Sequence, residues 1–199
     1  MRILSLRIKN FRNFGDFEIN FEKVGALLFG PNGLGKTNLL EAISYFSYGK
    51  SFRSISDKNC IKFDEEIAQL NSEFLVNNNF IKFDIAIDQK NKVVRIQDKK
   101  INRLSELYSL VKIVYFSPDD TQIISGSPKL RRRFFDIAIS QYNYNYLNLL
   151  TKYSRLLKQR NAFLKNSVFN QEEKDIWDIE FAKVANNIIK IRLDYLNKF

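Results

Sequence analysis

Eight residues, Gly30-Pro-Asn-Gly-Leu-Gly-Lys-Thr37, have the types and spacing of a loop that binds phosphate groups. The glycines let the backbone curl so that successive N–H groups point at a phosphate, helped by the dipole of the helix that follows. Lys36 supplies a charge to the β- and γ-phosphates, and Thr37 offers a hydroxyl ligand to Mg²⁺. The alternative is a glycine-rich turn without a ligand. The loop therefore predicts ATP or GTP with Mg²⁺, bound by Gly30, Pro31, Asn32, Gly33, Leu34, Gly35, Lys36 and Thr37.

The composition excludes several other kinds of chemistry. The 199 residues contain no histidine, which rules out histidine-based catalysis and makes a zinc site hard to build. Cys60 is the single cysteine, so an internal disulfide is excluded, and a small, partly buried apolar role is expected for it. No run approaches the roughly 20 apolar residues of a membrane span, and the N-terminus lacks a secretory signal. We expect a cytoplasmic protein.

The positive charge is concentrated near the C-terminus. The formal net charge is +10, and residues 129–199 hold 14 Lys/Arg against 7 Asp/Glu. A concentrated surplus favours a polyanionic partner such as DNA, because neutralising phosphates releases counterions. A lysine-rich, solvated surface is the alternative.

The loop needs a strand before it and a helix after it, and the pattern around it predicts both. The apolar run 24–29 is typical of a strand buried on both faces, and residues 39–46 follow a helical period. Alternation predicts strands over 2–9 and 14–21, and three more runs within 67–97 predict an antiparallel meander. A short helix at 104–110 and a second buried strand at 111–116 complete the first part.

From Pro128 onward, the apolar residues recur at three- and four-residue steps. Residues 142–157 and 176–196 therefore predict two long amphipathic helices packed as an antiparallel hairpin, separated by the polar stretch 166–171. The expected fold is α/β, with an ATPase lobe over 1–127 and a helical arm over 128–199.

Three segments flank the loop: Asn10-Phe-Arg-Asn-Phe14, Asn38-Leu-Leu-Glu-Ala-Ile43 and Gly49-Lys-Ser-Phe-Arg53. A fourth consists of Pro118-Asp119, followed by Ile123-Ile-Ser-Gly-Ser-Pro128 and by Arg131-Arg-Arg-Phe-Phe-Asp136. Together they resemble the RecF family of SMC-like, ABC-type ATPases, and the fourth segment is the most specific. Phe135 departs from the family pattern, where an aliphatic residue is usual. The resemblance runs over the whole chain.

The resemblance implies an ATP-binding protein that dimerises around ATP and binds DNA at single-strand/double-strand junctions. It implies action with RecR and RecO to load recombinase at gaps, in support of replication and the SOS response. It also implies slow ATP hydrolysis. The Walker B carboxylate and the signature serine of the family have no match here, so we expect an incomplete lobe that does not hydrolyse ATP alone. Asp119, Asp120 and Gln122 are either metal- or water-sensing residues or, for the aspartates, helix caps.

The resemblance also assigns individual residues. Arg12 is expected to reach the nucleotide phosphates, with a solvated turn arginine as the alternative. Arg53 and the run Arg131, Arg132 and Arg133 are candidate DNA contacts, against salt bridges at a domain junction. The tyrosines at 142, 144 and 146 are candidates for stacking on bases, but Tyr142 and Tyr146 fall on the apolar helix face, where core packing is expected instead.

Three other functions remain open. A transporter-type ATPase subunit is disfavoured by Arg131 and Arg132. An SMC-like protein outside the RecF family would show long heptad repeats, and a decayed fragment would not bind nucleotide.

Overall fold

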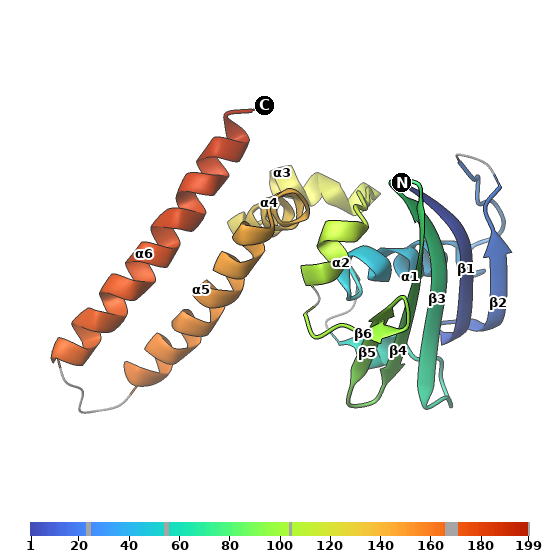
Figure 1. The fold of residues 1–199 in the computed structure, drawn as a ribbon, viewed down its shortest axis with the longest axis horizontal. Coiled ribbons are helices and arrows are strands. Elements are labelled where there is room, and N and C mark those ends of the chain that lie inside the picture. Colours follow the sequence, from blue (N-terminus) through green and yellow to red (C-terminus); the bar gives the residue numbers. More distant parts are fainter. Residues whose placement is uncertain (23–24, 54–55, 104, 166–170, 199) are drawn as a thin grey trace. The chain divides into compact units, whose positions relative to one another are not determined.

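The protein divides into two compact units, Met1–Tyr115 and Phe116–Phe199. The structure is a computed structural model, and it describes residues 1–22, 25–53, 56–103, 105–165 and 171–198 (Figure 1). The sequence pattern changes character near residues 125–131, whereas the division between the units falls at Tyr115. The short segment before Pro128 therefore groups with the helices.

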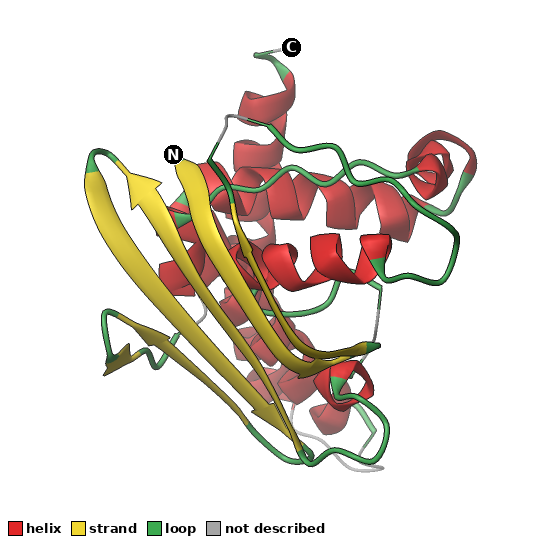
Figure 2. Cartoon of the chain, turned by 90° about the vertical axis from the view of Figure 1, so that its right-hand side faces the viewer, coloured by secondary structure: helices red, strands yellow, loops and turns green. Residues whose placement is uncertain are grey.

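A six-stranded antiparallel sheet forms the framework of the first unit, in the order β2-β1-β3-β4-β5-β6 (Figures 1 and 2). The strands are β1 (Arg2–Phe11), β2 (Phe14–Asn20), β3 (Ile67–Val76), β4 (Asn79–Asp88), β5 (Lys92–Ile96) and β6 (Lys99–Lys100). The helical segments of this unit are α1 (Lys36–Tyr48), η1 (Asp57–Cys60) and α2 (Ser105–Leu110). The predicted first hairpin and meander are confirmed. Residue 104 of the predicted short helix lies outside the described residues.

Tight turns set the register of the meander. Asn77 and Asn78, between β3 and β4, both have positive φ, as do Gln97 and Asp98 between β5 and β6. Two-residue hairpin turns with positive φ match the twist of the strands they join, and asparagine and aspartate tolerate that conformation well. The β6 strand has two residues, which is too short for an alternating pattern to reveal.

Helix α1 packs on one face of this sheet. Phe46 lies against Phe74 of β3 and Phe83 of β4, with ring centroids 5.7 and 6.1 Å apart. Leu39 and Ala42 of the same helix are buried in the same cluster. Burying such apolar side chains contributes about 1.5 to 3 kcal/mol for each large one. The sheet thus fixes the helix whose N-terminus carries the phosphate loop.

The two predicted strands at 24–29 and 111–116 are wrong for the residues described. Residues 25–29 and 111–116 form neither strand nor helix. Leu27 and Phe29 are 85% and 88% exposed, and Val114 is 92% exposed. An apolar run indicates burial but does not specify its neighbours, and a strand forms only where another strand accepts its hydrogen bonds. No described segment pairs with either run, while residue 24 lies outside the described part.

The second unit is helical. It contains η2 (Pro118–Thr121), α3 (Gln122–Ser125), α4 (Pro128–Tyr142), α5 (Tyr144–Phe163) and α6 (Gln171–Leu196). The helices α5 and α6 lie side by side and antiparallel (Figure 1), as the periodicity predicts, and most of the polar stretch between them lies outside the described residues. The separate helix α4 is a further finding. No helix among the described residues is long and apolar enough to cross a membrane.

A partly buried polar cluster joins the three long helices. Asp136 of α4 accepts hydrogen bonds from the Tyr146 hydroxyl of α5 at 2.5 Å and from Arg192 Nη2 of α6 at 2.7 Å. Tyr146 is fully buried, and its burial, followed by its hydrogen bond to Asp136, raises its pKa. The expected core packing is confirmed for Tyr146 and wrong for Tyr142, which is 70% exposed, while Tyr144 is 45% exposed.

Candidate functional site: the phosphate loop and its polar network

The loop at 30–37 adopts the backbone that its glycines permit. Gly30, Gly33 and Gly35 have φ of 141°, 88° and 99°, a region that residues with a Cβ rarely adopt. Gly35 is the N-cap of α1, so the first free N–H groups of the helix face the loop. Free N–H groups and the positive end of the helix dipole together favour an anion at this place.

A pocket of about 310 Å³ opens at this helix start, at the small end of the range of roughly 300 to 1,000 Å³ typical of ligand sites. It is lined by Asn32, Gly33, Gly35, Lys36, Thr37, Asn38 and Arg53. The Lys36 ammonium donates to the carbonyl oxygens of Gly30 and Pro31, both at 2.7 Å. The carbonyl oxygens of the loop therefore hold the Lys36 side chain beside the pocket. The Leu34 side chain is 61% exposed, and its Cδ1 lies 3.1 Å from the place of a Cβ on Gly30.

The donor set fits a nucleotide phosphate chain. Two cations, Lys36 and Arg53, and the N–H groups of the loop and helix start face one pocket, where no acidic side chain is among the lining residues described. Thr37 also lines the pocket, and its hydroxyl would be available to Mg²⁺. When bound, Mg²⁺ would neutralise charge on the phosphates.

Arg53 lies in this pocket, although the sequence suggested it as a DNA contact. Its Nη1 donates to Asn38 Oδ1 at 2.9 Å and lies 3.8 Å from Glu41 Oε2. The Arg53 side chain is 48% exposed. The Gly49–Arg53 segment thus reaches the phosphate site, which its position in the sequence does not indicate.

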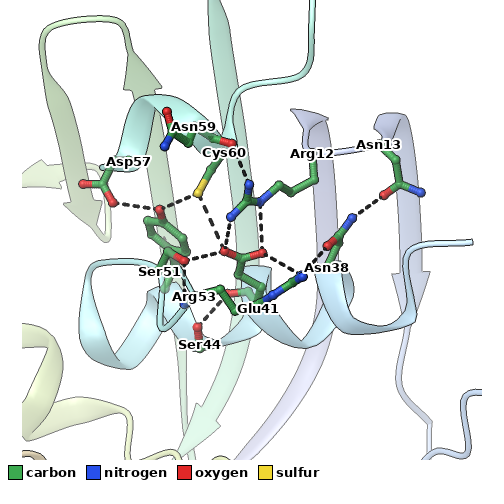
Figure 3. A network of polar contacts seen from close by, with 11 residues as sticks. Arg12, Asn13, Asn38, Glu41, Ser44, Ser51, Arg53, Asp57, Asn59 and Cys60 are labelled. Carbon is green, nitrogen blue, oxygen red and sulfur yellow. Dashed lines mark hydrogen bonds and ion pairs between the residues drawn. The ribbon is translucent and has the colours of Figure 1, made fainter. Parts of the chain in front are cut away.

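Arg12 does not line the pocket. Its Nε donates to Glu41 Oε2 at 3.0 Å and its Nη2 to Glu41 Oε1 at 2.7 Å (Figure 3). Its Nη1 donates to the Asn59 carbonyl at 2.7 Å. The hydrogen bonds to Glu41 raise the pKa of Arg12 above its ordinary value. The contact of Arg12 with nucleotide phosphates stays a prediction.

Glu41 is the centre of the network in Figure 3. Its side chain is fully buried, and besides Arg12 it accepts a hydrogen bond from the Ser51 hydroxyl. The Cys60 thiol lies 3.8 Å from Glu41 Oε1. A buried carboxylate is stable only when it is paired and hydrogen-bonded. Glu41 therefore ties helix α1 to the turn after β1 and to the segments at 51–53 and 60.

Tyr45 extends this network to Asp57. Its hydroxyl donates to Asp57 Oδ1 at 2.8 Å and lies 3.2 Å from the Cys60 sulfur. Burial raises the pKa of both the Tyr45 hydroxyl and the Cys60 thiol. Both groups are therefore neutral in the folded protein at ordinary pH. The expected role of Cys60 as a small buried side chain agrees with its full burial.

The β1–β2 turn packs directly on the loop. Asn13 Nδ2 lies 3.4 Å from the Gly33 carbonyl, and Asn13 Oδ1 accepts from Asn38 Nδ2 at 2.8 Å. A Cβ on Gly35 would lie 2.7 Å from Asn13 Oδ1 and 3.0 Å from Phe14 Cζ. Gly35 is therefore required both by its φ and by the side chains above it.

The arginines of α4 differ in their surroundings. Arg131 Nη1 donates to the carbonyl oxygens of Gly126 and Ile124 at 3.0 and 3.2 Å, so it closes the end of helix α3. Arg132 and Arg133 are exposed. The contact of Arg131, Arg132 and Arg133 with DNA stays a prediction.

Asp120 has a structural role. Its Oδ2 accepts from the backbone N–H of Ser117 at 2.5 Å, at the start of η2. A side chain that reaches back three residues to the first N–H is the acidic half of a capping box. The sequence alternative in which an aspartate of this segment caps the next helix is thus confirmed for Asp120.

Three residues of the network, Asn13, Asn38 and Glu41, received no role from the sequence. One signal could have found Glu41, because it falls on the same helical face as Tyr45 and Tyr48, where an acid needs a buried partner. The partners themselves come from segments far apart in the chain. Only the folded structure brings them together.

The fold and sequence match known proteins. The chain is 38% identical over 199 residues to the DNA replication and repair protein RecF of Streptococcus gordonii, covering all of this chain and 55% of that protein. It is 38% identical over 200 residues to RecF of Clostridium acetobutylicum, again covering 55%. The chain thus spans about half the length of the curated relatives it matches.

The comparison of structures points the same way. A solved structure described as the recombination mediator protein RecF-ATP in the RecFOR pathway matches with a TM-score of 0.95 and 32% identity, over 99% of this chain and 54% of that one. A family model described as an AAA domain matches residues 5–198. The chain belongs to this AAA domain family, and over its whole length it is similar to the N-terminal part of RecF.

Proposed function

We propose that this chain is the ATP-binding part of a RecF-type recombination mediator, and that ATP binds with Mg²⁺ at the pocket of Lys36 and Thr37. The observation that carries the proposal is the pocket itself, in which two cations and the free N–H groups of a helix start converge. The solved relatives described as RecF-ATP and RecF-ATPrS support ATP as the nucleotide.

In this proposal each group of the site has a separate task. The loop N–H groups and the Lys36 ammonium bind the β- and γ-phosphates, and Thr37 ligates Mg²⁺. Arg53 adds a second cation at the pocket mouth. Arg12 holds Glu41 in place through hydrogen bonds to Glu41 and to the Asn59 carbonyl.

The action of the complete protein follows from its relatives and is part of the proposal. The chain works in the cytoplasm with RecO and RecR, forms an ATP-dependent homodimer, and binds DNA at single-strand/double-strand junctions. There it loads recombinase at gaps and supports replication and the SOS response. The RecFOR pathway named for the relative in the RecF-ATP structure supports this assignment.

A titration of the 199-residue chain with Mg²⁺-ATP tests the nucleotide site. Lys36→Ala removes the charge partner of the β- and γ-phosphates, and the dissociation constant for ATP should rise about ten-fold or more. Lys100→Ala is the matched control, because Lys100 is an exposed lysine of β6 in the same unit. Its affinity for ATP should equal that of the wild type. Equal affinities in Lys36→Ala and the wild type would place the nucleotide elsewhere.

A further inference from the structure

We propose that Asn38 and Asn13 form an amide relay that positions Arg53 over the phosphate pocket, so that both are positioning residues for recognition of a triphosphate. The inference rests on the proposed nucleotide site and deepens it. Asn38 uses both ends of its side chain, since its Oδ1 accepts from Arg53 Nη1 at 2.9 Å and its Nδ2 donates to Asn13 Oδ1 at 2.8 Å (Figure 3). Its orientation is therefore fixed by two partners of opposite hydrogen-bonding type.

The relay is anchored on the phosphate loop. Asn13 Nδ2 lies 3.4 Å from the Gly33 carbonyl oxygen, and Asn13 Oδ1 would lie 2.7 Å from a Cβ placed on Gly35. Asn13 thus contacts the loop before the lysine, while Asn38 follows that lysine in α1. A shift of the loop backbone moves Asn13, and through Asn38 it moves the acceptor of Arg53.

Arg53 needs such a support because the second contact of its guanidinium with the described residues, the one to Glu41, is weak. Its side chain is 48% exposed, and its guanidinium lies 3.8 Å from Glu41, beyond hydrogen-bond distance. Holding a long, exposed side chain in one rotamer costs side-chain entropy. The Asn38 carbonyl offsets part of that cost before the ligand arrives, which is the general advantage of preorganisation.

The relay should favour ATP over ADP. A positioned cation attracts a ligand in proportion to the ligand's charge, and ATP carries one more negative charge than ADP. A variant in which Arg53 is no longer held in place should therefore lose more affinity for ATP than for ADP. A purely structural role for Asn38 would weaken both nucleotides equally.

A double-mutant cycle on the 199-residue chain tests the relay. The variants are Asn38→Ala, Arg53→Ala and the double variant, each titrated with Mg²⁺-ATP and Mg²⁺-ADP. Asn38→Ala alone should lower the affinity for ATP about three- to ten-fold and the affinity for ADP by less. In the Arg53→Ala background, Asn38→Ala should change the affinity for ATP by less than about two-fold, because the effects of coupled residues are not additive. Asn13→Ala should behave in the same way with a smaller effect.

Two controls keep the cycle interpretable. Asn71→Ala removes an asparagine of β3 whose side chain donates to Asp84 Oδ1 of β4 at 2.6 Å. This variant should leave the affinities for ATP and ADP unchanged. Thermal unfolding of every variant shows whether it is folded at the titration temperature. Should Asn38→Ala unfold, Asn38→Ser takes its place, because a serine is too short to bridge both partners.

The outcomes separate the relay from the nucleotide site itself. If Lys36→Ala leaves ATP binding unchanged, the proposed nucleotide site fails. The relay alone is overturned if Lys36→Ala weakens ATP binding but Asn38→Ala lowers the affinity for ATP by the same factor with and without Arg53. It is also overturned if Asn38→Ala lowers the affinity for ADP as much as the affinity for ATP.

Discussion

Arg12 and Glu41 form a two-point ion pair, with Nε and Nη2 of the guanidinium 3.0 and 2.7 Å from the two oxygens of a fully buried carboxylate. Arg12 follows β1 with φ of 55°, an uncommon conformation for a residue with a side chain. Such strain persists only where the surroundings hold it. The pair therefore fixes the turn that packs on the phosphate loop.

Arg12→Ala should destabilise the chain by about 2 to 3 kcal/mol, because it leaves a buried carboxylate short of its main partner. Urea unfolding measures the change. Arg7→Ala is the matched control, since both side chains of the Arg7–Asp16 pair are about half exposed and water screens the attraction between them. Adding Glu41→Gln to Arg12→Ala should restore part of the loss. Equal losses for the two arginine variants would refute the role of the buried pair.

The Cys60 thiol should make stability depend on alkaline pH. Burial raises the pKa of the Cys60 thiol in the folded protein above the ordinary value of 9.0. The contribution of the thiol to the free energy of unfolding is therefore fully present below that value and is lost as pH rises through the folded pKa. The free-energy difference between wild type and Cys60→Ala should therefore shrink between about pH 8 and about pH 10. Urea unfolding under reducing conditions measures it. A difference that stays constant over this range would show that the thiol titrates alike in both states.

Arg132 and Arg133, rather than Arg131, should carry the DNA contact of α4. Both are exposed, whereas Arg131 donates to two backbone carbonyls. Arg132→Ala combined with Arg133→Ala should lower the salt dependence of DNA binding by up to about two in log–log slope. Arg131→Ala, the comparison variant, should lower the unfolding temperature and leave the slope nearly unchanged. A slope that responds only to Arg131 would reverse the assignment.

The chain alone should not turn over ATP appreciably. Phosphoryl transfer depends on positioning a metal and a water, and the sequence offers no Walker B carboxylate after residue 120. Phosphate release, with Mg²⁺ and DNA present, should equal that of Lys36→Ala. Clear Mg²⁺-dependent release that both Lys36→Ala and Asp119→Asn abolish would identify Asp119 as the missing carboxylate.

The sequence predicts the loop well because its chemistry is local. Gly30, Gly33 and Gly35 are needed because the loop backbone has positive φ at these positions, and Lys36 and Thr37 follow at fixed steps. The conformation of the loop therefore depends on residues within the motif itself. The hairpins are local in the same sense, since turn residues and alternation lie within a few positions of one another.

The rest of the site depends on contacts between distant segments. Arg53 lines the pocket beside Asn38 and Glu41, which lie on α1 and precede it by more than ten positions. The apolar run at 25–29 looks like a buried strand, yet Leu27 and Phe29 are exposed. Hydrophobicity records that a segment is suited to burial, while pairing and position are set by its neighbours.

The most direct test of the proposed nucleotide site is a crystal structure of the 199-residue chain with Mg²⁺ and a slowly hydrolysed ATP analogue. We expect the β-phosphate within about 3 Å of the N–H groups of the loop, Lys36 Nζ in contact with the phosphates and Thr37 Oγ1 in contact with Mg²⁺. A nucleotide bound away from this loop, or a phosphate chain that Lys36 does not contact, would contradict it.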